Sequence, residues 1–95
     1  MRAYEVMYII NPELDEEQTT AVIDKFKGIV ENNGSEIVKL DKWGKRRLAY
    51  EIKRKRDGFY VLMNLNGTPE MVHELDRVFK ITDEVIKHLI LREED

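Results

Sequence analysis

Six stretches of the chain have a regular pattern of hydrophobic and polar positions, and each pattern predicts one strand or helix. Residues 3–10 are rich in aromatic and β-branched side chains and stop at Asn11-Pro12, so they predict a buried strand that ends in a turn. Asp15, with Gln18 three residues later, has the pattern of a capping box and predicts the start of a helix that ends before Gly34. The apolar stripe of this helix consists of Val22, Ile23, Phe26, Ile29 and Val30.

A long stretch of strand-like alternation follows the first helix. Apolar and polar residues alternate with period two across residues 37–52, which predicts one long strand that bends near Gly44. Asp57-Gly58 is a hairpin-type turn signal, and residues 59–65 have the composition of a third strand. Residues 53–58 are therefore expected to form a protruding basic turn.

The last two elements complete a recognisable order. Thr68-Pro69 combines an N-cap with proline at the first helical position, and residues 85–91 predict a fourth strand. The order βαββαβ predicts an α+β, ferredoxin-like fold, in which both helices cover one face of a four-stranded antiparallel sheet. The second helix has the apolar stripe Met71, Val72, Leu75, Val78 and Phe79. The residues expected between sheet and helices include Val6, Phe26, Val30, Leu65, Leu75 and Phe79.

The opposite face of this sheet has no helix to cover it. In the first strand, Tyr4, Val6, Tyr8 and Ile10 share one face, whereas Glu5, Met7 and Ile9 share the other. Whichever set faces away from the helices still carries apolar groups. An uncovered apolar face predicts a macromolecular partner.

Length and composition limit the class of protein. The 95 residues, 42% of them apolar, are expected to form a single domain over residues 1–95. The chain has no cysteine, which fits a reducing cytoplasmic compartment. The early charges at Arg2 and Glu5 argue against a secretion signal, and no apolar run reaches the length of about 20 residues that a membrane helix needs.

Charge is segregated along the chain. The formal net charge is −3, but residues 39–56, here called the basic segment, hold nine basic and two acidic side chains and carry +7, while the remaining residues carry −10. Lysine and arginine bind phosphates, and aromatic rings stack on bases, so a basic segment that contains Trp43 and Tyr50 predicts a polyanion-binding surface. The alternative is a solvated strand and turn with ordinary surface charge.

The individual residues of this surface have different strengths as candidates. Arg46 and Arg47 are the strongest, because a guanidinium grips phosphate at two points and also stacks on a base, whereas Lys45 supplies a point charge. Trp43 is either a stacking platform or a half-buried cover over the strand bend, and Tyr50 is expected to pack. Two interpretations fit the charges of residues 53–56: they bind phosphate, or they only keep a hairpin soluble and block pairing at the strand edge. The candidate RNA-binding residues are Arg2, Lys42, Trp43, Lys45, Arg46, Arg47, Lys53, Arg54, Lys55, Arg56 and Arg92.

Motifs of enzymes and metal sites are missing from the sequence. His73 and His88 are 15 residues apart without cysteine nearby, so neither a metal site nor a cofactor is expected. The carboxylates of residues 15–17 suit a helix start better than an acid/base pair. Residues 57–61 match the glycine-aromatic motif of RNA-recognition-motif domains poorly.

Three blocks of this sequence resemble the family of bacterial small-subunit ribosomal protein S6. They are residues 2–12 (RAYEVMYIINP), residues 43–52 (WGKRRLAYEI) and residues 58–64 (GFYVLMN), and they agree with that family in order and spacing over essentially the whole chain. Two departures are visible. Glu51 stands where some relatives have proline, and the chain lacks the long acidic C-terminal extension of others, so no processing of a glutamate tail is inferred beyond Asp95.

The resemblance implies a non-catalytic protein with two kinds of partner. These are the central domain of 16S ribosomal RNA and ribosomal protein S18, with which the family assembles as a heterodimer on the ribosome in the cytoplasm. Two alternatives from other classes are a regulatory ligand-binding module that dimerises through its sheet and a small acylphosphatase-type enzyme. The second needs an arginine in the loop after the first strand, and residues 11–14 contain none.

Overall fold

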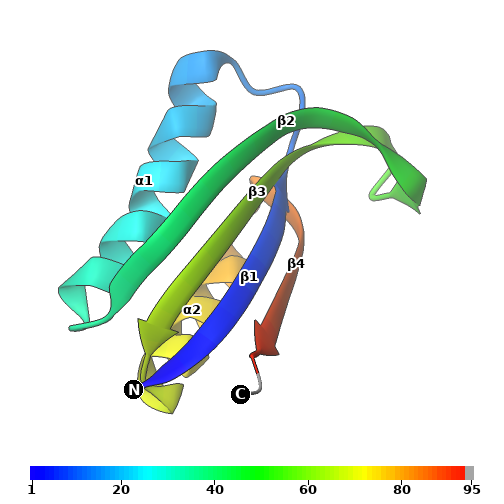
Figure 1. Cartoon of the computed structure of the whole chain (residues 1–95). Helices are drawn as coiled ribbons and strands as arrows, with labels where there is room; N and C mark the ends of the chain where they lie inside the picture. Colours follow the sequence, from blue (N-terminus) through cyan, green and yellow to red (C-terminus); the bar gives the residue numbers. More distant parts are fainter. Residues whose placement is uncertain (94–95) are drawn as a thin grey trace.

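The computed structural model describes residues 1–93, so Glu94 and Asp95 lie outside the described residues. Its elements follow the predicted order βαββαβ (Figure 1). They are β1 (Arg2–Ile10), α1 (Glu16–Asn32), β2 (Glu36–Ile52), β3 (Lys55–Gly67), α2 (Pro69–Ile81) and β4 (Val85–Arg92).

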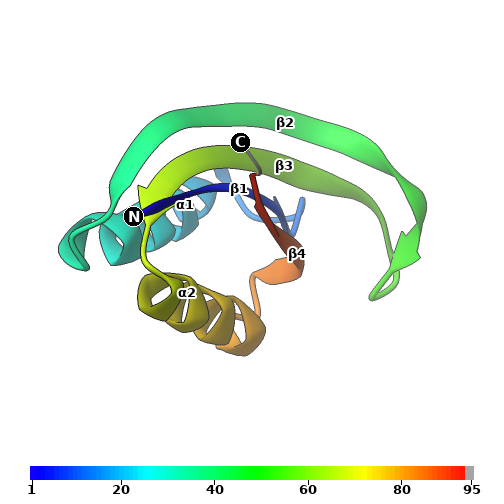
Figure 2. The same cartoon turned by 60° about the horizontal axis from the view of Figure 1, so that its bottom comes forward.

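The four strands form one antiparallel sheet with the order β2-β3-β1-β4. In its centre, Val6 of β1 lies opposite Met63 of β3 on one side and Ile90 of β4 on the other. Both helices lie on the same face of the sheet (Figures 1 and 2). The predicted ferredoxin-like fold is therefore confirmed.

Both helices begin with the predicted caps. The Asp15 carboxylate accepts a hydrogen bond from the backbone N–H of Gln18 at 2.7 Å, and the Gln18 side chain accepts one from the backbone N–H of Asp15 at 3.1 Å. At the start of α2, the Thr68 hydroxyl accepts from the backbone N–H of Met71 at 3.2 Å, and Pro69 occupies the first turn. These bonds satisfy N–H groups that lack partners inside each helix.

The main core lies between the sheet and the two helices, and all six residues predicted for it are buried there. Its centre is aromatic: Tyr8 lies with its ring centroid 5.4 Å from that of Phe26 and 4.9 Å from that of Phe79. Because the Tyr8 hydroxyl is buried in this cluster, with Asp24 nearby, its pKa is raised well above the ordinary tyrosine value.

Two strands extend beyond the rest of the sheet. Pairing between β1 and β3 ends at Ile10 and Phe59, whereas β2 and β3 continue as a two-stranded ribbon, here called the β2–β3 arm (residues 45–58). Figures 1 and 2 show this arm projecting past β1 and β4. The predicted bend is present: Gly44 has φ +80°, and the β2–β3 register shifts between Lys42 and Gly44. Glycine tolerates this left-handed backbone, which strains other residues.

The turn of the arm lies elsewhere than predicted. Ile52 pairs with Lys55, so Lys53 and Arg54, with φ of 48° and 65°, form the two-residue tip. The prediction of a turn at Asp57-Gly58 was wrong, since both residues lie inside β3. Local preference favours asparagine and glycine at such a tip. Tertiary packing overrides it here, because Gly58 is buried against the side chains of Ile9 and Leu48.

No described helix covers the second face of the sheet, here called the open face, although the arm shields one end of it. There, Leu48 of the arm joins Ile9 and Ile86 in a second small apolar cluster. The remainder exposes Leu89 and Leu91 of β4 to solvent. Neither of the two described helices is long and apolar enough to cross a membrane.

Candidate nucleic-acid interface

The predicted RNA-binding residues fall into two unequal groups. Nine of them lie on the β2–β3 arm or just before it. The antiparallel ribbon pairs residues 42–47 with residues 57–61, and residues 53–56 lie at and next to its tip. Arg2 pairs with Gly67, and Arg92 pairs with Tyr4, so both arginines lie at the other end of the sheet. The structure thus separates Arg2 and Arg92 from the arm.

Most cations of the basic segment have no carboxylate partner. Lys39 forms an exposed ion pair with Asp41 at 3.4 Å, and Lys55 pairs with Glu13 at 2.9 Å. Within residues 1–93, no ion pair involves the other seven cations, all of which are exposed. These seven are Lys42, Lys45, Arg46, Arg47, Lys53, Arg54 and Arg56. An unneutralised cluster of this size creates a positive potential that attracts polyanions.

Lys55 differs from its neighbours. Its side chain is largely buried, and its ammonium group joins the arm to the loop between β1 and α1 through Glu13. An ammonium that already has a carboxylate partner attracts phosphate less than one without. The geometry therefore favours a structural role for Lys55 within the arm.

The Trp43 side chain links the bend to the arm. It is 47% exposed, its ring lies nearly parallel to that of Tyr60 at a centroid distance of 6.5 Å, and the Arg46 guanidinium lies 5.4 Å from its centroid. A cation over an indole face is attracted by the ring quadrupole. Trp43 therefore orients Arg46, while the donors of the guanidinium remain available for phosphate.

Arg46 and Arg47 lie on opposite faces of the arm. They pair with Gly58 and Asp57 in an unbroken register, so their side chains point to opposite sides of the ribbon. Arg46 shares a side with Trp43, whereas Arg47 does not. The arm thus presents one guanidinium to each side, which suits contact with a phosphate backbone that wraps around a projecting ribbon.

Two aromatic residues behave differently from expectation. The prediction that Tyr50 packs was wrong, because it is 62% exposed and its hydroxyl accepts a hydrogen bond from Lys87 of β4 at 2.8 Å. Tyr60, a partner of Trp43, was not among the predicted site residues. Alternation placed Tyr60 and Leu62 on one face of the third strand, but the position of Tyr60 beside Trp43 depends on the β2–β3 register.

One titratable cluster lies outside the arm, between α2 and β4. The Asp76 carboxylate receives hydrogen bonds from Lys80 at 2.9 Å and from His88 at 2.7 Å, and these bonds lower the pKa of Asp76 although desolvation opposes them. The His88 ring also stacks on Phe79 at 4.9 Å. This cluster joins the helix to the edge strand and is structural.

Comparison with known proteins decides the family. The sequence profile of the family Ribosomal protein S6 matches residues 3–92. The chain belongs to the ribosomal protein S6 family. It is 58% identical over 93 residues to the small ribosomal subunit protein bS6 of Desulforamulus reducens, with 98% of each chain covered. It is 52% identical over 94 residues to that of Carboxydothermus hydrogenoformans, with 99% of this chain and 98% of the relative covered.

The fold agrees with a solved S6 structure. The crystal structure of 30S ribosomal protein S6 from Thermotoga maritima superimposes with a TM-score of 0.92 at 31% sequence identity, covering 97% of this chain and 87% of the other. Membership of the S6 family assigns the chain to the proteins of the small ribosomal subunit. It favours this assignment over the acylphosphatase-type enzyme and the regulatory module raised by the sequence.

Proposed function

We propose that this S6 protein is a non-catalytic, single-domain component of the bacterial small ribosomal subunit that binds the central domain of 16S ribosomal RNA through the β2–β3 arm. It acts in the cytoplasm, on the ribosome, together with ribosomal protein S18. The observation that carries the proposal is the set of seven exposed cations without a carboxylate partner among residues 1–93, which lie on the projecting arm or just before it in an otherwise acidic protein. Arg2 and Arg92 supply a second, weaker contact at the far end of the sheet.

The tip of the arm supports the same function. Lys53 and Arg54 adopt positive φ without being glycine or asparagine, which costs about 1 to 2 kcal/mol for each residue. A turn of higher intrinsic stability would replace both by Asn-Gly. Strain that persists at a charged tip is typical of a functional site, and here the function is to present two cations to phosphate.

We assign the open face of the sheet to ribosomal protein S18. Leu89 and Leu91 are 45% and 50% exposed there, next to the partly buried Met7 and Leu62. The isolated protein carries a net charge of −3, so a partner that covers this face and adds positive charge strengthens RNA binding. Binding of RNA and of S18 is therefore cooperative.

The test combines two arginine variants with a salt series. Filter binding of a central-domain RNA fragment is measured at several salt concentrations for the wild type, Arg46→Ala and Arg47→Ala, with and without S18. Each variant is expected to weaken binding and to lower the slope of log K against log salt by about one unit for each phosphate that the protein no longer neutralises. Arg77→Ala on α2 is the matched control, since Arg77 is exposed and pairs with Glu74. Equal slopes for all four proteins would refute the arm as the RNA interface.

A further inference from the structure

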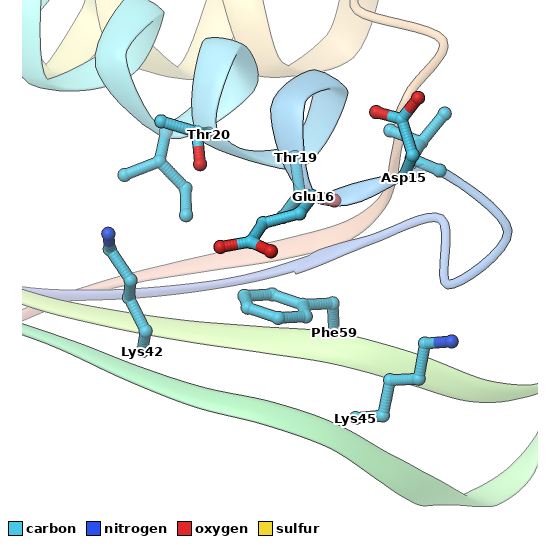
Figure 3. Close-up of a pocket in the computed structure, with 9 residues that line it drawn as sticks. Asp15, Glu16, Thr19, Thr20, Lys42, Lys45 and Phe59 are labelled. Atoms are coloured by element: carbon cyan, nitrogen blue, oxygen red, sulfur yellow. The ribbon is translucent and has the colours of Figure 1, made fainter.

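A pocket of about 580 Å³ lies between the first turns of α1 and the strands β2 and β3 (Figure 3). Its size is within the range of small-molecule sites. The Phe59 ring forms the sheet side of the pocket, and Leu14 and Ile23 contribute further apolar surface. An aromatic side chain that lines a pocket of this size is a platform on which a flat ligand can stack.

Four charged side chains line this pocket, and one of them, Asp15, already caps α1 by accepting a hydrogen bond from the backbone N–H of Gln18. The other three surround the Phe59 platform. Figure 3 shows the Glu16 carboxylate extending from α1 toward Phe59, with Lys42 to one side and Lys45 to the other. Across residues 1–93, none of these three groups takes part in an ion pair within 4.0 Å. Apart from the capping carboxylate of Asp15, the pocket therefore offers one anionic acceptor and two cationic donors that form no ion pair among the described residues.

We propose that this pocket binds a guanine nucleotide, with the base stacked on Phe59 and its Watson–Crick edge on Glu16. A carboxylate has two acceptor oxygens and no donor. Guanine is the common base whose Watson–Crick edge presents two adjacent donors, N1–H and the N2 amino group, whereas the other bases present an acceptor next to any donor. Lys42 and Lys45 then bind the phosphate, because a lysine ammonium is a point charge on a flexible stem that can follow the position of the phosphate.

The charges argue against a basic peptide as the occupant. An arginine side chain of a partner protein could stack on Phe59 and pair with Glu16, but the two lysine ammonium groups would repel it. A nucleotide carries its negative charge on the phosphate and its donors on the base, so it matches both signs. If the nucleotide belongs to an RNA chain, the pocket is part of the RNA-binding function proposed above and rests on it. If the nucleotide is free, the pocket is a separate site.

Titration of the full-length protein with mononucleotides, followed by NMR, tests the pocket. GMP is expected to bind at least about tenfold more tightly than AMP or CMP, and IMP, which lacks the N2 amino group, to bind with intermediate affinity. Glu16→Gln is expected to abolish the preference for GMP, because the glutamine NH2 is itself a donor and cannot accept a hydrogen bond from the N1–H or N2 amino group of guanine. Glu17→Gln is the matched control: Glu17 is exposed in the same helical turn, does not line the pocket, and should behave as wild type.

Two pentanucleotides, UUGUU and UUAUU, identify the source of the nucleotide. Tighter binding of UUGUU than of GMP, abolished in Glu16→Gln, assigns the pocket to an unpaired guanosine of RNA; tighter binding of GMP assigns it to a free nucleotide. Equal affinities for GMP and AMP, or an unchanged preference in Glu16→Gln, would overturn the proposal. Neither result bears on the arm, because Arg46→Ala and Arg47→Ala are tested separately on the central-domain fragment.

Discussion

Gly58 of the arm lies directly against Ile9 of β1, and the contact leaves no space for a Cβ atom on Gly58. A Cβ built there would overlap Ile9 Cγ2 and lie 3.3 Å from Leu48 Cδ2. This contact holds the arm against the end of the sheet. It explains why a glycine stands in the middle of a strand, where its conformational freedom is otherwise a cost.

Gly58→Ala is therefore expected to destabilise the protein. An added methyl group in a packed site costs about 1 to 3 kcal/mol, which urea unfolding measures. Gly28→Ala is the control, because the nearest atom to its Cβ is Asn32 Nδ2 at 3.9 Å and alanine favours the helix by about 0.5 to 1 kcal/mol. If Gly58→Ala unfolds at the same urea concentration as the wild type, the arm is not held by this contact.

Trp43 and Arg46 should act on RNA as a coupled pair. Trp43→Ala is expected to weaken RNA binding two- to fivefold, since an exposed cation–π contact is worth about 0.5 to 1 kcal/mol, while Trp43→Phe keeps an aromatic face and most of the affinity. The double variant Trp43→Ala/Arg46→Ala should weaken binding by less than the sum of the two single effects. Strictly additive effects in filter binding would show that Trp43 does not orient Arg46.

Replacing the two residues at the tip of the arm should raise stability and weaken RNA binding. Lys53→Asn/Arg54→Gly introduces the residues preferred at a two-residue turn with positive φ, so the free energy of unfolding is expected to rise by about 1 kcal/mol. The same variant removes two cations and should lower the salt slope of RNA binding by up to about two units. Urea titration and filter binding on one protein preparation measure both effects. A variant that is stabilised but binds RNA with the wild-type slope would remove the tip from the interface.

Leu89 should matter for the S18 partner and little for folding. Leu89→Ser is expected to weaken association with S18 in calorimetry, because the side chain is exposed on the open face of the isolated protein. Ile81→Ser is the control, since Ile81 is 64% exposed at the end of α2, away from the open face. Equal effects of the two variants on S18 binding would argue against the open face as the contact surface.

The Asp76 cluster predicts a pH dependence of stability. Its hydrogen bonds, first from Lys80 and then from His88, lower the pKa of Asp76 in the folded protein. A depressed carboxyl pKa contributes stability that is fully present above the unfolded pKa of about 4 and is lost as pH falls through the folded value. The difference in unfolding free energy between the wild type and Asp76→Asn should therefore shrink as the pH falls below about 4. A difference that stays constant to pH 2 would contradict this linkage.

Local signals in the sequence predicted the elements and most of the core. The capping box at Asp15 and the N-cap at Thr68 are short-range hydrogen bonds, so their residues are visible in the sequence alone. Phe26 in α1 and Phe79 in α2 each belong to an apolar stripe at helical spacing within its own helix. Two amphipathic helices with four strands leave few ways to close a core. The bend at Gly44 was predictable because only glycine readily adopts its φ of +80°.

The site was predicted as a set of residues but not as a geometry. Charge segregation identified the cations of the basic segment, yet the pairing of Lys55 with Glu13 joins residues 42 positions apart. The grouping of Trp43 with Tyr60 likewise depends on the β2–β3 register, which includes a bulge. Register is set by pairing over the whole ribbon and not by composition.

For this S6 protein, the sequence by itself determined the order of the elements, the amphipathic faces and the basic segment, because each depends on residues close together in the chain. Only the tertiary structure decided where the arm turns. Asp57-Gly58 has the stronger local turn preference, but Gly58 is the residue small enough to lie against Ile9, so the chain turns at Lys53-Arg54 instead. Packing between distant strands thus overrides a local preference of about 1 to 2 kcal/mol per residue and places two cations at the end of the arm.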